Sequence, residues 1–338
     1  MSWVGITSFT QYIKIFKHIK NKTIINYIPQ EHSPAMEYSW YEDHNVRAVE
    51  EALTKNNNKL IHILGGFHGC KPDLESMENT KVVYWPSYWV HHTYYNLDFA
   101  INEDSSKIYK DKLFVCLNGR PHAHRAMLID ELAKQNLLSD GYVSWHSSFD
   151  KTSKAEHFCD YDFKYFDGEA IIPDGDIKNS NQYNPPEFFD KGLVNLVAET
   201  STDKPFITEK TIVPIFRKKP FLVLGCQYWY KALQSLGFRL YSEIFDYSFD
   251  IEPDLDVRIE MITDNIKKLQ GMDYQEVYEK VLPVAEYNYY VASKIVKGKD
   301  PWLPKDLLTT INIDLKNNRN GIVLLEQENV IREVLNRV

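Results

Sequence analysis

Short runs of apolar residues recur along the chain, and most of them are followed by a polar turn and then by apolar residues at helical spacing. Apolar runs bounded by Gly, Pro or Asn are typical of strands buried on both faces. Such runs predict strands over 59–64, 81–85, 112–117, 142–145, 193–197, 220–225 and 238–241. Helical spacing predicts helices over 128–134, 211–217, 228–236, 257–269 and 274–296.

The alternation of strands with helices predicts parallel sheets covered by helices on both faces. The polar stretch 103–107 separates two such series, and 338 residues are enough for two domains. We therefore expect an α/β protein with two Rossmann-like, doubly wound domains facing a cleft, over 1–108 and 109–300, with a helical extension over 301–338. Within the second domain, residues 150–190 are polar and weakly periodic, which predicts an irregular segment.

Composition narrows the classes of protein to consider. Apolar residues make up 43% of the chain, which is ample for packed cores, and the net charge of −8 argues against a surface devoted to non-specific nucleic-acid binding. The four cysteines are far apart and form no CxxC pair, as in proteins of reducing compartments. No signal-like stretch or long apolar run is apparent, so we expect a soluble protein of the cytoplasm, or of the host cytoplasm if viral, with no membrane partner.

The polar loop 199–210 lies between a predicted strand and a predicted helix, which is where α/β proteins bind phosphorylated ligands. The helix start offers unpaired N–H groups, Lys210 adds a full positive charge, and Glu209 can accept hydrogen bonds from ribose hydroxyls. Arg125 follows the strand 112–117 in a comparable turn, so Arg125 and Lys210 could converge on one pyrophosphate. The alternative is that each is a solvated residue at a helix end.

Several segments, taken in order, resemble one enzyme family. They are Asn118 with Arg125, then Glu-Thr-Ser at 199–201, Phe-Ile-Thr-Glu-Lys at 206–210, Lys-Pro-Phe-Leu-Val-Leu-Gly at 219–225, and Leu-Gln-Ser-Leu-Gly-Phe at 233–238. This set is similar to the C-terminal half of α-1,3-fucosyltransferase-like glycosyltransferases, and Asn-Gly-Arg-Pro-His at 118–122 resembles phage-encoded members. The resemblance covers roughly residues 111–250. The chain departs from the pattern at Thr200, where the family usually has Asn.

The resemblance implies a GT-B fold and an inverting transfer of a sugar from a nucleotide-sugar donor to an acceptor hydroxyl. It implies no metal and no cofactor beyond the nucleotide-sugar co-substrate. The second domain would bind the nucleotide-sugar, with Arg125 and Lys210 on the diphosphate, Glu209 on the ribose and Glu199 on the sugar side. Asn118 and Thr208 complete the expected set. The first domain would face the acceptor, which is a glycan or a hydroxymethylated base in phage DNA.

Inversion needs a general base that takes the proton of the acceptor hydroxyl, and cationic groups that stabilise the leaving diphosphate. The best placed bases are His68 and Asp73, just after the strand 59–64. Further polar candidates are Glu42, Asp43, His44, His91 and His92. Because none of these forms a recognisable catalytic motif, a non-catalytic α/β binding or structural protein that retains the glycosyltransferase scaffold is the alternative.

Residues 160–162 form an Asp-Tyr-Asp triplet of the kind that holds divalent cations in other glycosyltransferases. The triplet lies in the irregular segment without a preceding strand. We therefore interpret it as part of a solvated loop and predict no metal site.

Overall fold

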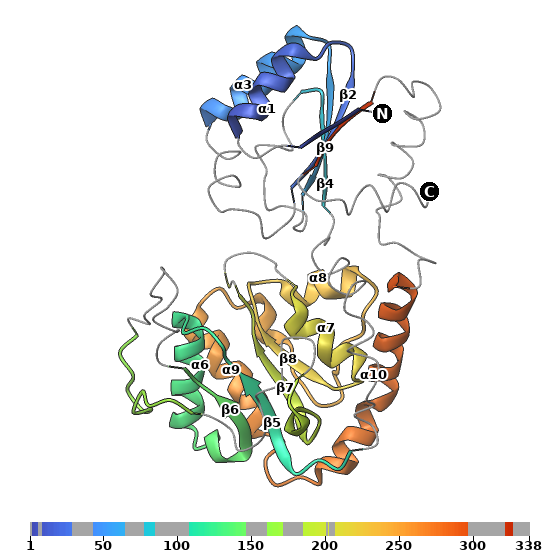
Figure 1. Cartoon of the computed structure of the whole chain (residues 1–338). Coiled ribbons are helices and arrows are strands. Elements are labelled where there is room, and N and C mark those ends of the chain that lie inside the picture. The colour runs from blue at the N-terminus through green and yellow to red at the C-terminus, as the bar shows by residue number, and fades with distance from the viewer. Residues whose placement is uncertain are drawn as a thin grey trace. The chain divides into compact units, whose positions relative to one another are not determined.

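The computed structural model describes residues 2–5, 9–28, 43–64, 78–84, 108–146, 161–171, 185–200, 202, 207–296 and 322–326. The chain divides into two compact units (Figure 1). Unit 1 comprises Met1–His91 together with Gly298–Val338, and unit 2 comprises His92–Lys297. The sequence predicts boundaries at 108 and 300, whereas unit 2 begins at His92 and ends at Lys297.

Unit 1 contains a five-stranded sheet in the order β1-β9-β2-β3-β4, in which every pairing is parallel. The strands are β1 (Ser2–Gly5), β2 (Thr23–Ile28), β3 (Lys59–Leu64), β4 (Thr80–Tyr84) and β9 (Ile322–Glu326). The helices α1 (Phe9–His18) and α3 (Asp43–Lys55) pack against each other (Figure 1). The strands β3 and β4 confirm two predicted runs, whereas β1, β2, α1 and α3 were not predicted.

The strand β9 corrects the expectation of a helical extension over 301–338. Residues 322–325 read Ile-Val-Leu-Leu, an apolar and partly β-branched run that suits a strand with a neighbour on each side. They pair with β1 on one side and with β2 on the other, for example Val323 with Ser2 and with Ile24. The segment is therefore an interior strand of the sheet.

Unit 2 contains a four-stranded parallel sheet in the order β6-β5-β7-β8. Its strands are β5 (Lys112–Leu117), β6 (Gly141–Ser144), β7 (Gly192–Ala198) and β8 (Phe221–Leu224). From β5 the chain first adds β6 on one side, and then crosses to add β7 and β8 on the other. The direction of strand addition reverses at β5, and in open α/β sheets ligands bind at the carboxyl ends of the strands beside such a reversal.

The helices of unit 2 are α6 (Ala123–Lys134), α7 (Glu209–Phe216), α8 (Trp229–Ser235), α9 (Leu255–Lys267) and α10 (Tyr274–Val296). The helix α6 packs against α9, and α7 packs against α10; Figure 1 shows the two pairs on opposite sides of the sheet. The strands and helices predicted between 112 and 225, and the helices up to 296, are confirmed with small shifts at their ends. The chain is thus an α/β protein with parallel sheets.

The predicted strand over 238–241 is wrong. Phe238 and Tyr241 are buried, which produces the apolar pattern, but the backbone between them pairs with no strand. Instead, Asn288 on α10 binds both backbone polar groups of Arg239: its Oδ1 accepts from Arg239 N at 2.8 Å, and its Nδ2 donates to Arg239 O at 2.9 Å. A single side chain therefore replaces a sheet neighbour.

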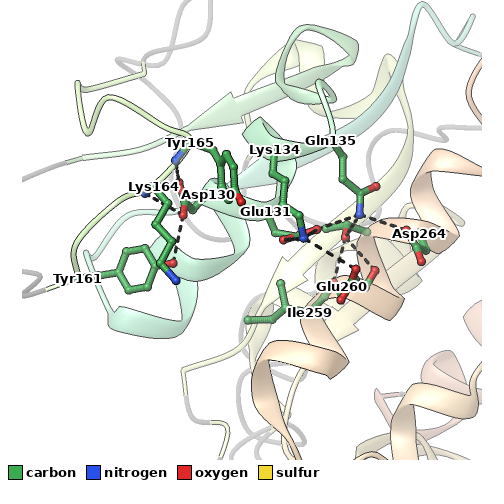
Figure 2. Close-up of polar contacts among 11 residues, drawn as sticks. Asp130, Glu131, Lys134, Gln135, Tyr161, Lys164, Tyr165, Ile259, Glu260 and Asp264 are labelled. Carbon is green, nitrogen blue, oxygen red and sulfur yellow. Dashed lines mark hydrogen bonds and ion pairs between the residues drawn. The ribbon is translucent and has the colours of Figure 1, made fainter.

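The irregular segment 150–190 is held to unit 2 where it is described. The carboxylate of Asp130 on α6 accepts hydrogen bonds from the backbone N–H groups of Lys164, Tyr165 and Phe166 and from the Tyr161 hydroxyl (Figure 2). Residues 161–171 contain no helix, and Ile171 bridges to Trp145 at the end of β6. The described part is irregular, as the sequence predicts, and Asp130 fastens it to a helix of the main fold.

On its other side α6 is tied to α9. The side-chain amide of Gln135 donates to Thr263 Oγ1 at 2.9 Å and to Asp264 Oδ1 at 3.1 Å (Figure 2).

None of the described helices is long and apolar enough to cross a membrane.

Candidate ligand site at the carboxyl edge of the second sheet

The residues predicted to bind a sugar donor lie at the carboxyl ends of two neighbouring strands. Asn118 directly follows β5, Glu199 directly follows β7, and these strands pair in parallel. Thr208 is the N-cap of α7, and Glu209 and Lys210 form its first turn. The fold therefore brings the two predicted halves of the site, separate in the sequence, to the same edge of one sheet.

Glu199 is the best connected residue of this edge and is completely buried. Its Oε1 accepts hydrogen bonds from Thr208 N at 3.1 Å and Thr211 Oγ1 at 3.0 Å. Its Oε2 accepts from Thr208 Oγ1 at 2.7 Å and from Thr200 N at 3.3 Å. The carboxylate therefore closes the loop after β7 by binding the start of α7.

Lys210 places a positive charge at the start of α7. Its Nζ lies 2.9 Å from Glu209 Oε1, 3.2 Å from Thr200 Oγ1 and 3.3 Å from Thr208 Oγ1. The side chain remains 28% exposed, so the ammonium group can still meet a ligand from solvent. The first helical turn adds partial positive charge at the same point, although the N–H of Lys210 already donates to Thr208 Oγ1 at 3.3 Å.

Arg125 comes from the first turn of α6 and is 4% exposed. Its Nη1 donates to Arg120 O at 3.0 Å, but its Nε finds no hydrogen-bond partner among the described residues. The neighbouring His124 lies with Nε2 2.7 Å from the backbone oxygen of Glu199, which ties the start of α6 to the end of β7. Arg125 is therefore fixed beside the Glu199 loop while part of its guanidinium is unsatisfied.

Asn118 contributes an unsatisfied hydrogen-bond acceptor, whereas Arg125 contributes an unsatisfied donor. Its backbone N–H donates to Ser144 Oγ at 2.9 Å, and its Nδ2 lies 3.3 Å from both Ser144 O and Cys116 Sγ. These contacts orient a side chain that is almost fully buried, yet its Oδ1 has no partner among the described residues. A buried polar atom without a hydrogen-bond partner lowers the stability of the fold by roughly 1–3 kcal/mol, so a ligand atom that bonds to it would be favoured.

The charges of this edge act on one another. Burial lowers the pKa of Arg125, and the negative charges of Glu199 and Glu209 oppose that shift. Burial likewise raises the pKa of Glu199, against the positive charge of Lys210. Since Arg125 and Lys210 both act on Glu199, the two cations belong to one electrostatic cluster.

Sequence reasoning missed three residues that build this edge. Thr211 supplies a hydroxyl to Glu199, Ser144 orients Asn118, and His124 joins α6 to β7. Thr211 could have been found, because it lies one helical turn after Thr208 and so faces the same side of α7. The other two contacts depend on sheet pairing that no local pattern reveals.

The predicted bases His68 and Asp73 lie outside the described residues, as do Glu42, His91 and His92. In the Asp-Tyr-Asp triplet, Asp162 is exposed and Asp160 is outside the described ranges. Within the part of the chain that the structure describes, no three His, Cys, Asp or Glu side chains gather as metal ligands.

No protein-family model, curated protein or solved structure matches this chain. Fold and site together define an α/β protein with a polar, cation-bearing cluster at the carboxyl edge of a parallel sheet.

Proposed function

We propose that the chain is an inverting glycosyltransferase that transfers a sugar from a nucleotide-sugar to an acceptor hydroxyl. The observation that carries this proposal is the placement of Arg125 on α6 and of Lys210 at the start of α7, because both helix starts contact the loop after β7 at the carboxyl edge of β5 and β7. Parallel sheets bind nucleotides at this edge, beside a reversal of strand order. The resemblance to fucosyltransferase-like enzymes involves the same residues. In this proposal the two units are Rossmann-like domains that face a cleft, as in GT-B enzymes.

The cations fit the chemistry of the leaving group. As the bond from the sugar to the diphosphate breaks, negative charge grows on the phosphate oxygens. Arg125 can meet two of those oxygens with its planar guanidinium, while Lys210 acts as a point charge at a helix start. Positive groups that are already in place lower the barrier without a metal ion. The unpartnered Nε of Arg125 is a hydrogen-bond donor for which an anionic ligand is a suitable acceptor.

The remaining residues divide into positioning and binding roles. Glu199 has both carboxylate oxygens occupied by the loop and α7, which favours a role in holding Lys210 in place over contact with the sugar. Glu209 accepts from Lys210 through one oxygen, and its second oxygen suits a ribose hydroxyl. Asn118 offers its unpartnered Oδ1 as an acceptor for a hydroxyl or N–H group of the nucleotide-sugar.

The base that deprotonates the acceptor comes from the first domain, with His68 and Asp73 as the candidates. The acceptor is a glycan or a hydroxymethylated base in DNA. The net charge of −8 favours the glycan, because proteins that bind duplex DNA gain affinity from phosphate contacts. Gel-shift affinity for DNA that falls steeply with salt would favour the DNA acceptor instead.

Isothermal titration calorimetry of the full chain against UDP, GDP and CMP, and against their sugar conjugates, tests the proposal. We expect one nucleotide to bind and its sugar conjugate to be turned over. If no nucleotide binds, the alternative is favoured, namely a non-catalytic binding or structural protein on the same scaffold. The observation in favour of that alternative is that the Glu199 carboxylate and the Lys210 ammonium group both have hydrogen-bond partners within the protein. Glu199 accepts from Thr208 N, and Lys210 donates to Thr200 and Glu209.

A further inference from the structure

Tyr228 has an unusual backbone conformation at the end of the second sheet. It follows β8 and precedes α8 as its N-cap, with φ 64° and ψ 20°, in the left-handed region. Among the described residues, the other non-glycine residues with positive φ are Lys218 and four asparagines, Asn21, Asn57, Asn79 and Asn136. Asparagine tolerates this region, but a bulky aromatic side chain is strained there, and N-cap residues normally have extended backbone.

Asp250 holds this conformation in place. Its backbone oxygen accepts from Tyr228 N at 2.7 Å. Its carboxylate oxygens accept from Tyr230 N at 2.8 Å and Lys231 N at 3.1 Å, which satisfies the first turn of α8. The side chain of Tyr228 makes no capping hydrogen bond. Because Asp250 supplies the cap, the tyrosine ring is not needed to start the helix.

The ring of Tyr228 is instead presented to solvent. The residue is 47% exposed, and the Lys231 ammonium lies 5.6 Å from the ring centroid. Gly or Asn would adopt the same backbone conformation at lower cost in free energy. The protein nevertheless has a strained tyrosine here, whose aromatic ring is exposed. Strained backbone that its surroundings hold in place is concentrated at functional sites.

Tyr228 is on the same edge of the sheet as the cluster formed by Arg125, Glu199 and Lys210. The backbone N–H of Glu199 donates to Leu224 O at 3.0 Å, so the end of β8 adjoins the Glu199 loop. Tyr228 follows Leu224 by four residues, and a chain of that length spans at most about 14 Å. The ring therefore lies within reach of a ligand whose phosphates are held by Lys210 and Arg125.

We infer that Tyr228 is the stacking platform for the nucleobase of a nucleoside diphosphate bound at this edge. The inference rests on the proposed function, and it adds the residue that contacts the base. Bases stack on aromatic faces with little regard to their identity, since every base has a π-face. Tyr228 therefore strengthens nucleotide binding, whereas the choice between uracil, guanine and cytosine falls to other groups.

Calorimetry of the full chain with GDP, UDP and inorganic pyrophosphate separates base stacking from phosphate binding. We expect Tyr228→Ala to weaken binding of the preferred nucleoside diphosphate about 5- to 150-fold, the range typical of base stacking. Pyrophosphate has no base, so its affinity should not change. Tyr228→Phe keeps the ring and should bind the nucleotide like the wild type.

Tyr290→Ala is the matched control, because Tyr290 on α10 is 55% exposed and has the Lys294 ammonium 4.3 Å from its ring. It should leave every affinity unchanged. Wild-type nucleotide affinity in Tyr228→Ala, or an equal loss for pyrophosphate and nucleotide, would overturn the stacking role. If the wild type binds pyrophosphate but no nucleotide, the platform is also excluded, while absence of both would refute the proposed function itself.

Tyr228→Gly gives a second, independent readout. Glycine relieves the strain at positive φ, so the melting temperature should stay the same or rise while nucleotide affinity falls as in Tyr228→Ala. A lower melting temperature with unchanged affinity would mean that the ring serves packing alone, and would overturn the inference.

Discussion

Thr208 donates twice to the same carboxylate: its backbone N–H lies 3.1 Å from Glu199 Oε1 and its hydroxyl lies 2.7 Å from Glu199 Oε2. The same hydroxyl oxygen caps α7 by accepting from Lys210 N at 3.3 Å. One threonine thus couples the end of β7 to the start of α7. The position of the Lys210 charge depends on that coupling.

Glu199→Gln should therefore destabilise the fold. The amide keeps the shape but replaces one acceptor oxygen by an NH₂ group, which faces N–H and O–H groups and leaves buried hydrogen-bond donors unpaired. The free energy of unfolding should fall by roughly 2–3 kcal/mol, measured by urea denaturation. Glu260→Gln is the control, since Glu260 is 57% exposed and its ion pair with Lys134 spans 3.8 Å. Equal stability of the two variants would contradict the role of Glu199.

Lys210→Ala and Arg125→Ala should each abolish measurable transfer from the sugar donor. Removing one preorganised group that stabilises developing charge typically costs about 10²–10³-fold in rate. Circular dichroism should show that the secondary structure is retained in both variants. Lys191→Ala removes a half-buried lysine that is paired with Glu187 at 3.1 Å, and should transfer sugar at the wild-type rate. Wild-type turnover in both site variants would rule out the proposed diphosphate site.

Asp130→Asn should show a stability loss that depends on pH. Burial raises the pKa of Asp130, but the hydrogen bonds from Tyr165, Phe166, Lys164 and Tyr161 outweigh it, so the pKa in the folded state lies below the ordinary 3.8. The carboxylate therefore contributes stability above pH 3.8, and this contribution is lost as the pH falls further.

The difference in unfolding free energy between wild type and Asp130→Asn should be about 1–3 kcal/mol at pH 7 and 5, and should shrink below pH 4. Urea denaturation at each pH measures it. Limited proteolysis should cut residues 161–171 faster in the variant at pH 7. A difference that stays constant down to pH 3 would mean that Asp130 does not hold this segment through its charge.

Cys116 should resist alkylation in the folded protein. It is completely buried on β5, and burial raises the pKa of its thiol from 9.0 to about 11. The thiolate that reacts with iodoacetamide is therefore scarce and inaccessible at pH 8. Peptide mapping by mass spectrometry should find Cys116 unmodified in native protein and modified after unfolding in urea. Rapid native labelling would show that the strand opens readily.

The strands of unit 2 were predictable because parallel strands under helices are buried on both faces. In β7 every residue is buried, and the sequence shows an apolar run that only Asn195 interrupts. Unit 1 was harder, since β1 has four residues and its partner β9 lies near the other end of the sequence. The strand at 238–241 was predicted wrongly because buried residues produce an apolar pattern even where the backbone pairs with no strand.

The charged residues of the candidate site were predictable, but the hydrogen bonds between them and their neighbours were not. Arg125, Glu199 and Lys210 stand out because charged groups follow apolar strands. That Glu199 accepts hydrogen bonds from Thr208 and Thr211 depends on the start of α7 lying beside the end of β7. A pattern along the sequence records which residues are near a strand end, but not which atoms meet there.

The place of β9 between β1 and β2 also affects the order in which the chain can fold during synthesis. The sole sheet neighbour of β1 among the described strands is β9, so β1 has no partner until residues 322–326 have been made. Unit 2 is by then fully translated, and its sheet needs nothing from either end of the chain. We therefore expect unit 2 to fold first. The sheet of unit 1 is completed only after β9 has been synthesised.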